Sequence, residues 1–272
     1  MTAAGGAFTD EVVKAAGVSV QLRRGGRGAP LLILHGELGV PGWLRAYAQL
    51  AEQFTVYVPA LPGFGRSARP DWIVGVRDLA AWTTWFVRDL KLSQPLPVIG
   101  FSLGGWIAAE IATMNAALFT KMVLVGAAGL QPEAGQIWDY FVHSNREAFA
   151  RAFYDGAKSP EYAQYYDRPW TAEEEAQAEQ NREMAARLVW KPYMRSHTLA
   201  GLLGGIATPT LVVWGARTRS SRSRHATATC GRFRGDGHGL GPLRSHARDG
   251  EARGVRALGA RLPGAARLRQ GS

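Results

Sequence analysis

Residues 96–112 read LPVIGFSLGGWIAAEIA, and this stretch decides the fold. Its first four residues form a short apolar run typical of a buried strand, and the residues from Leu103 to Met114 have the spacing of a helix. Between them, Gly100 to Gly104 match the pattern G-x-S-x-G. So tight a turn from strand to helix requires small residues beside the serine, and its strain lifts the serine hydroxyl clear of the backbone. We therefore predict that Ser102 is a nucleophile held at a strand–helix turn.

A second short motif, His35-Gly36-Glu37, follows an apolar run at residues 31–34. A helix starting near Leu103 aims its first N–H groups and its dipole at an oxyanion forming beside Ser102. We expect the backbone N–H groups of Glu37 and Leu103 to form the oxyanion hole together. The Glu37 carboxylate is expected to face solvent or a covering element, because a charge aimed at an oxyanion opposes catalysis. His35 is expected to be a structural, hydrogen-bonding histidine.

Apolar runs and helical periodicities alternate along the first 216 residues. Short, continuously apolar strands interleaved with helices favour a mostly parallel sheet with helices on both faces, which is the α/β class. The predicted strands are Val18–Leu22, Leu31–Leu34, Thr55–Val58, Leu96–Ile99, Met122–Val125 and Leu211–Trp214, and the predicted helices lie at 42–52, 78–90 and 103–114.

Between Gly129 and Ala207 helical patterns follow one another without strands, which predicts a cap over the carboxyl edge of the sheet. The expected helices are Ile137–Asn145, Ser159–Tyr166, Thr171–Val189 and Tyr193–Leu203, with Thr171 and Glu174 as a capping box. The predicted organisation is a core at 1–128, a cap at 129–207, a core strand at 208–216 and a tail at 217–272. Aromatic residues of the cap suggest an apolar acyl or aryl pocket, although core packing explains them equally well: Trp138, Tyr140, Phe141, Phe153, Tyr162, Tyr165 and Tyr166.

Composition describes a globular protein of 272 residues, 46% hydrophobic and 20% charged. No run approaches the roughly 18 apolar residues of a membrane span, and the first residues lack an apolar signal region. A single cysteine, Cys230, fits a reducing compartment, so a cytoplasmic location is expected. The net charge of +10 resides in the last 56 residues, which hold 13 arginines against three acids. The body is neutral, so we expect neither a nucleic-acid nor a membrane partner.

Four ordered motifs resemble successive signatures of capped α/β-hydrolases, in the serine-esterase and meta-cleavage-product-hydrolase-like branch. They are residues 34–36 (LHG), 62–67 (PGFGRS), 100–105 (GFSLGG) and 208–215 (TPTLVVWG). The resemblance covers residues 18–216 and implies the α/β-hydrolase fold, a Ser–His–Asp triad and an acyl-enzyme formed without cofactor or metal. A serine at position 102 separates the chain from the dehalogenase and epoxide-hydrolase branches, which carry an aspartate there.

The tail departs from this pattern. The resemblance implies an acid a few residues after Trp214-Gly215, but residues 216–221 read ARTRSS. The triad histidine is expected later, and His246 lies nearest the expected distance. His225 and His238 are alternative bases, and Glu133 lies where some relatives carry their acid. No predicted strand supports any of these histidines.

An out-of-frame reading of GC-rich DNA explains a tail rich in Arg, Ala and Gly, and back-translation tests the idea. From the third base of the Arg217 codon, permitted codons read D-A-I-V-P-V, which resembles the missing acid segment. The same frame permits Y-V-R-A-I-P-G between Ala228 and Gly235. From the second base of Arg244 they read G-H-T-H-E-M-E-K-P, with the histidine codon straddling Ser245 and His246. Two matches in the expected order favour a double frame shift over a natural tail replacement or a degenerate pseudo-enzyme.

The sequence predicts a hydrolase that cleaves carboxylic esters of small to medium acyl or aryl substrates through an acyl-enzyme on Ser102. Two other activities share the same motifs: C–C bond hydrolysis of meta-cleavage-type (vinylogous) diketones and cofactor-free perhydrolysis. An inactive binding protein is the alternative outside the enzymes, because the triad acid and base are missing from the tail. A nucleic-acid-binding role of the arginine tail would show binding that weakens steeply with salt.

Overall fold

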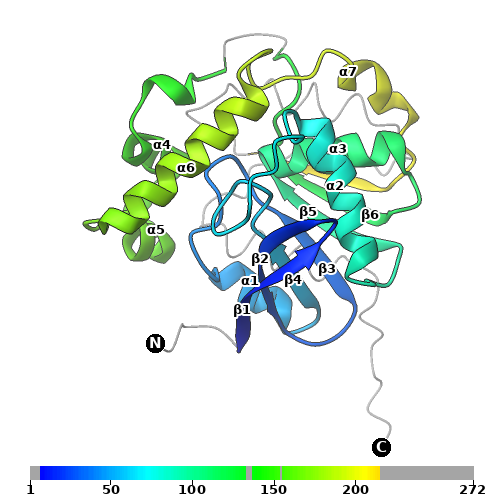
Figure 1. Cartoon of the computed structure of the whole chain (residues 1–272), viewed down its shortest axis with the longest axis horizontal. Coiled ribbons are helices and arrows are strands. Elements are labelled where there is room, and N and C mark those ends of the chain that lie inside the picture. Colours follow the sequence, from blue (N-terminus) through cyan, green and yellow to red (C-terminus); the bar gives the residue numbers. More distant parts are fainter. Residues whose placement is uncertain (1–6, 133–136, 154, 215–272) are drawn as a thin grey trace, which may run out of the picture.

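The computed structural model describes residues 7–132, 137–153 and 155–214. Within these ranges the chain forms a seven-stranded sheet with the order β1-β2-β4-β3-β5-β6-β7 (Figure 1). The predicted tail and the residues Glu133, His225, His238 and His246 lie outside the described residues. The strands are β1 (Phe8–Ala15), β2 (Val18–Gly25), β3 (Pro30–Leu34), β4 (Thr55–Pro59), β5 (Leu96–Phe101), β6 (Phe119–Val125) and β7 (Thr210–Val213).

The sheet is mostly parallel, as the sequence predicted. Strands β4, β3, β5, β6 and β7 pair parallel to one another. Strands β1 and β2 form an antiparallel ribbon, and β2 pairs antiparallel with β4. We did not predict β1, because its sequence FTDEVVKA is polar and largely exposed and shows no buried run. Its place is secured by pairing with β2 along its whole length.

Alternate residues of the central strands supply two separate cores. Leu32 and Leu34 pack with the side chains of α2 (Val76–Asp89) and α3 (Leu103–Met114). Leu31 and Ile33 pack with α1 (Arg45–Ala51) on the other face. Because successive side chains of a strand point to opposite faces, one continuous apolar run fills both layers. The fold is therefore the predicted α/β arrangement with helices on both faces.

Helical elements fill the chain between β6 and β7, and we call residues 137–206, without residue 154, the helical insertion. Its elements are η1 (Tyr140–Val142), α4 (Asn145–Ala152), η2 (Gly156–Lys158), α5 (Pro160–Tyr165), α6 (Ala172–Val189), α7 (Leu199–Leu202) and η3 (Leu203–Gly205). Figure 1 shows α4, α5 and α6 gathered on one side of the molecule, with α7 apart from them. The capping box of Thr171 and Glu174 opens α6 as predicted.

Two predicted helices of the insertion are wrong in extent. Residues 137–145 contain only the short turn η1 and the first residue of α4, since a capping box of Ser144 and Glu147 starts α4 where the predicted helix was to end. Residues 193–203 are helical only from Leu199, whose N–H donates to Ser196 Oγ at 3.1 Å. In both places a local side-chain acceptor fixes a helix start that apolar spacing does not reveal.

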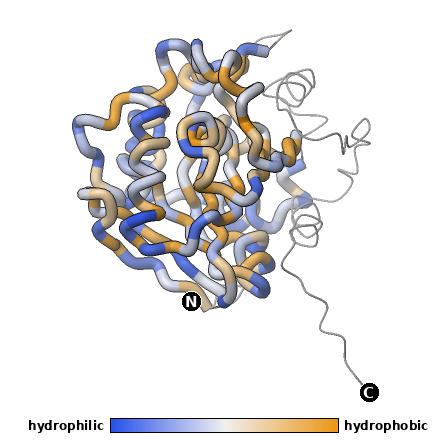
Figure 2. Tube along the Cα trace, turned by 90° about the vertical axis from the view of Figure 1, so that its right-hand side faces the viewer, coloured by the Kyte–Doolittle hydropathy of each residue, from blue (hydrophilic) through white to orange (hydrophobic). Residues whose placement is uncertain are grey.

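No helix in the described parts of the chain combines the length and the apolar character needed to cross a bilayer. Figure 2 shows the same feature along the trace, where apolar and polar stretches alternate and no long apolar segment stands out.

Candidate active site

Ser102 lies at the junction of β5 and α3, in a backbone conformation that side chains rarely adopt. Its φ is 45° and its ψ is −109°, and it is the residue that precedes the first turn of α3. Its N–H donates to Val125 O at 2.9 Å, and its carbonyl accepts from Trp106 N and Ala128 N, both at 3.1 Å. Three backbone hydrogen bonds therefore hold the strained turn that the sequence predicted.

Two glycines, Gly104 and Gly36, let the end of β3 approach this turn closely because they have no side chain. A Cβ at Gly104 would lie 2.1 Å from the carbonyl oxygen of Leu34, a distance that no real contact allows. A Cβ at Gly36 would lie 3.2 Å from Cβ of Ser102. The loop that begins with Gly36 thus runs directly beside the serine.

The two backbone N–H groups predicted to form the oxyanion hole are available for bonding. Leu103 is the first residue of α3, where the N–H groups have no acceptor within the helix. Among the described residues we find no acceptor for the N–H of Leu103 or for that of Glu37. Glu37 directly follows Gly36, whose backbone lies beside Ser102.

His35 is fully enclosed and uses both ring nitrogens. Its Nε2 accepts from Leu61 N at 2.9 Å, and its Nδ1 donates to Gly36 O at 2.7 Å. Burial lowers the pKa of His35 to about 4, so the ring is neutral at physiological pH. The ring also meets Phe64 edge-on, with 5.0 Å between the ring centres. His35 therefore ties the loop beside Ser102 to the segment after β4 and has no nitrogen left to act as a base.

Two other histidines are described, and both lie in the helical insertion. His143 stacks on Trp138 with 4.5 Å between ring centres and lies 3.8 Å from the Glu147 carboxylate. His197 is exposed. No hydrogen bond joins Ser102 Oγ to a histidine in the part of the chain that the structure covers. The predicted base, His246, lies outside the described residues, as do the alternatives His225 and His238.

Asn181 joins the helical insertion to two loops of the core, and sequence reasoning missed it. Its Nδ2 donates to Leu38 O at 3.2 Å, and its Oδ1 accepts from Gly65 N at 3.0 Å. It is only 7% exposed, and a Cβ at Gly39 would lie 2.4 Å from its Nδ2. A single asparagine within the polar run AEEEAQAEQNRE carries no signal of burial, because the loops it meets are distant in sequence.

The charge of the Glu37 carboxylate acts on two tyrosines of the helical insertion, Tyr140 and Tyr193. Its Oε2 atom is buried and has no hydrogen-bond partner among the described residues. Burial raises the pKa of Tyr193 to about 12, and the negative charge of Glu37 adds to that shift. Burial also raises the pKa of Tyr140, with Glu37 as the next largest cause. The charge of Glu37, a core residue, thus acts on side chains of the insertion.

Among the described residues, no group of histidine, cysteine, aspartate and glutamate side chains is arranged to hold a metal ion.

A family model described as "alpha/beta hydrolase fold" matches residues 29–233 of the chain. The chain is 26% identical over 133 residues to a 2-hydroxy-6-oxo-6-(2'-aminophenyl)hexa-2,4-dienoic acid hydrolase of Metapseudomonas resinovorans. It is 32% identical over 120 residues to a 2-hydroxymuconate semialdehyde hydrolase of Pseudomonas sp. (strain CF600). These matches cover 47% and 43% of this chain and only 45% and 42% of the two relatives, so the chain spans less than half their length.

The fold is shared with solved hydrolases. One is the meta-cleavage product hydrolase from Pseudomonas fluorescens IP01, with a TM-score of 0.67 and 19% identity. The match covers 82% of this chain and 85% of that one.

Proposed function

The chain belongs to the α/β-hydrolase fold family, and on that premise we propose that it is a serine hydrolase cleaving carboxylic esters of small to medium acyl or aryl groups. The observation that carries the proposal is the strained backbone of Ser102 between β5 and α3. A serine held there presents its hydroxyl beside free N–H groups at a helix start, which is the arrangement that acyl transfer needs.

The proposed reaction has two halves. Ser102 Oγ attacks the ester carbonyl and gives its proton to a base, and the N–H groups of Glu37 and Leu103 stabilise the tetrahedral oxyanion. Collapse releases the alcohol, which takes the proton from the base, and leaves an acyl group on Ser102. Water then gives a proton to the base and attacks the acyl-enzyme, and the same oxyanion hole stabilises the second tetrahedral intermediate. Its collapse releases the acid and returns the proton to Ser102 Oγ. His246 is the proposed base.

The aromatic side chains of the insertion support an acyl or aryl substrate. Phe141 meets Tyr140, Trp190 and Tyr193, with ring centres 4.8, 5.4 and 6.0 Å away. Of these residues, Tyr140 and Tyr193 are the ones on which the charge of Glu37 acts. We propose that the insertion is the cap that selects substrate shape.

The proposed triad needs an acid and a base that the tail, as written, does not supply in a recognisable context. We propose that the tail from Arg217 is a frame-shifted reading. Its restored reading places an aspartate shortly after Trp214-Gly215 and a histidine near position 246. Re-reading the coding DNA across positions 215–272 tests this directly, since an uninterrupted frame would refute it.

A second candidate is a C–C bond hydrolase of meta-cleavage-type diketones, which the names of the two curated relatives favour. One of those relatives is named for a dienoic acid. The Glu37 carboxylate, whose Oε2 has no hydrogen-bond partner among the described residues, supports the ester instead, because it would repel a substrate carboxylate in a partly buried site.

A substrate panel separates the candidates. In the frame-restored chain we expect turnover of p-nitrophenyl acetate, butyrate and benzoate and no turnover of a dienoate ketone. Cleavage of the dienoate ketone with no ester turnover would favour the C–C hydrolase. Turnover of neither, together with retained binding of aryl ligands, would indicate the inactive binding protein.

A further inference from the structure

Two groups of Glu37 bear on the proposed site: its backbone N–H and its side-chain carboxylate. Its N–H is the proposed oxyanion donor, so its carboxylate begins within one residue of the reacting carbonyl. The side chain is partly buried, and its Oε2 is enclosed without a hydrogen-bond partner among the described residues. A buried carboxylate oxygen without a donor costs free energy, so a group that satisfies it only when a ligand binds will contribute to affinity.

No cation of the described chain neutralises this carboxylate. The ion pairs found in the described ranges involve other acids, and none includes Glu37. Arg182 lies near Tyr140, with its guanidinium 5.7 Å from the ring centre. However, that guanidinium donates to the backbone carbonyls of Phe141 and His143, both at 2.5 Å. Arg182 keeps its positive charge there but forms no ion pair with Glu37, so no ion pair of the described residues compensates the carboxylate.

The neighbouring tyrosines do not supply the missing donor either. The Tyr193 hydroxyl donates to Trp138 O at 2.9 Å and accepts from Tyr140 N at 2.8 Å. Its proton is thus used within the insertion. Burial and the charge of Glu37 together raise the pKa of both tyrosines, which keeps them neutral. Among the described residues, neither tyrosine therefore satisfies the Glu37 Oε2 atom.

We propose that Glu37 makes the site selective for charge, so that it takes esters whose acyl part carries an ammonium group and rejects those that carry a carboxylate. This inference rests on the proposed function, because it assigns the substrate class of the same site. The ammonium donates to the unpartnered Glu37 oxygen while the ester carbonyl lies against the N–H groups of Glu37 and Leu103. Such charge-assisted hydrogen bonds are stronger than neutral ones, and a substrate carboxylate would meet like charge in a partly buried place.

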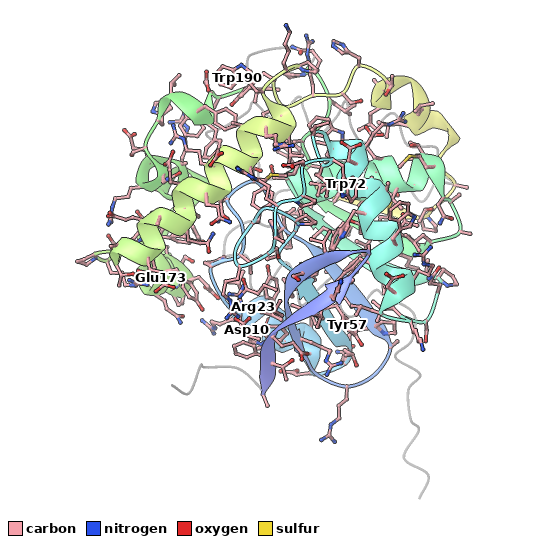
Figure 3. The ribbon with its side chains drawn as sticks, viewed as in Figure 1. Asp10, Arg23, Tyr57, Trp72, Glu173 and Trp190 are labelled. Atoms are coloured by element: carbon pink, nitrogen blue, oxygen red, sulfur yellow. The ribbon has the colours of Figure 1, made fainter. Side chains whose placement is uncertain are left out.

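The test compares three ligands of matched shape: benzylammonium, benzyl alcohol and benzoate. Isothermal titration of the full chain should show benzylammonium binding about tenfold more tightly than benzyl alcohol, and benzoate binding more weakly than either. Glu37→Gln keeps the size of the side chain and removes its charge, so it should abolish the preference for the cation and leave benzyl alcohol unchanged. Glu173→Gln is the matched control, because this exposed glutamate lies at the far end of α6 (Figure 3).

Equal affinities for the three ligands, no binding of any of them, or an unchanged preference in Glu37→Gln would overturn the inference. Labelling of Ser102 by a fluorophosphonate, measured on the frame-restored chain, reports on the proposed function separately. Labelling without charge preference would support the proposed serine hydrolase and refute the selectivity for ammonium-bearing esters. Charge preference without labelling would support the selectivity of the site for ammonium groups and refute the proposed serine hydrolase.

Discussion

At the scale of single residues, the motif around Ser102 was sufficient to predict the strained strand–helix turn that the structure shows. A pentapeptide that must turn from strand to helix within one residue leaves few conformations, and the observed φ of 45° follows from that constraint. His35 likewise was predicted to be structural, and its two hydrogen bonds explain why. Asn181 and the enclosed Glu37 oxygen could not be predicted, because their surroundings come from residues distant in sequence.

The buried His35 ring should make stability depend on pH. Its pKa of about 4 lies below the ordinary value of 6.5, so the unfolded chain binds the proton more readily between these values. The free energy of unfolding should therefore decrease by about 3 kcal/mol as the pH falls through this range. Denaturant unfolding of the parent and of His35→Asn across the range measures the effect. The exposed His197→Gln is the control and should behave as the parent does. If His35→Asn keeps the full pH dependence, His35 is not its source.

At the scale of elements, the core was predictable and the insertion was predictable only in part. The central strands and α3 lie where their apolar runs and spacing placed them, since burial on both faces leaves an unambiguous pattern. Strand β1 was not predicted, because pairing with β2, rather than burial of apolar side chains, holds it in place. The ends of η1, α4 and α7 depend on single capping side chains, which periodicity does not report.

The contact of α6 with the core should depend on Asn181. Asn181→Leu keeps a similar volume but leaves Leu38 O and Gly65 N without the partners they have now. A buried polar group left unpaired costs about 1–3 kcal/mol, so a loss of stability of that order is expected. Gln180→Leu is the comparison, because the exposed Gln180 side chain makes a single 3.3 Å hydrogen bond to Gly65 O. Thermal unfolding measures both variants, and equal melting temperatures would show that Asn181 does not carry the contact.

At the scale of the whole molecule, the described sheet ends at β7, and the comparisons support the family but not the substrate. The four motifs between residues 34 and 215 were sufficient to predict the fold, because each contains part of a strand or closely follows one. The triad acid and base could not be assigned in the same way, because they are expected in the tail, and the tail sequence has no apolar periodicity. In our proposal the insertion selects the substrate, and no motif encodes the placement of its side chains.

Restoring the reading frame should increase both stability and activity. Single-base changes near codons 217 and 235–244 should return an aspartate after Trp214-Gly215 and a histidine near position 246. The base needs a rigid position within hydrogen-bond reach of Ser102, and the arginine-rich segment carries no sequence pattern of the strand and helix expected to provide it. Losing triad partners costs several powers of ten in rate, so the chain as written should be nearly inactive on p-nitrophenyl butyrate. It should also melt at a lower temperature than the restored chain. Equal melting and equal turnover would show that the tail is a functional replacement.

The central claim is that Ser102 is the nucleophile, and covalent labelling tests it most directly. A fluorophosphonate should react with the Ser102 hydroxyl, releasing fluoride, and peptide mass spectrometry should find the adduct on the peptide that contains Ser102. In the restored chain, Ser102→Ala should abolish both labelling and ester turnover, while its thermal unfolding stays close to that of the parent. An adduct on another residue, or ester turnover that survives in Ser102→Ala, would contradict the account.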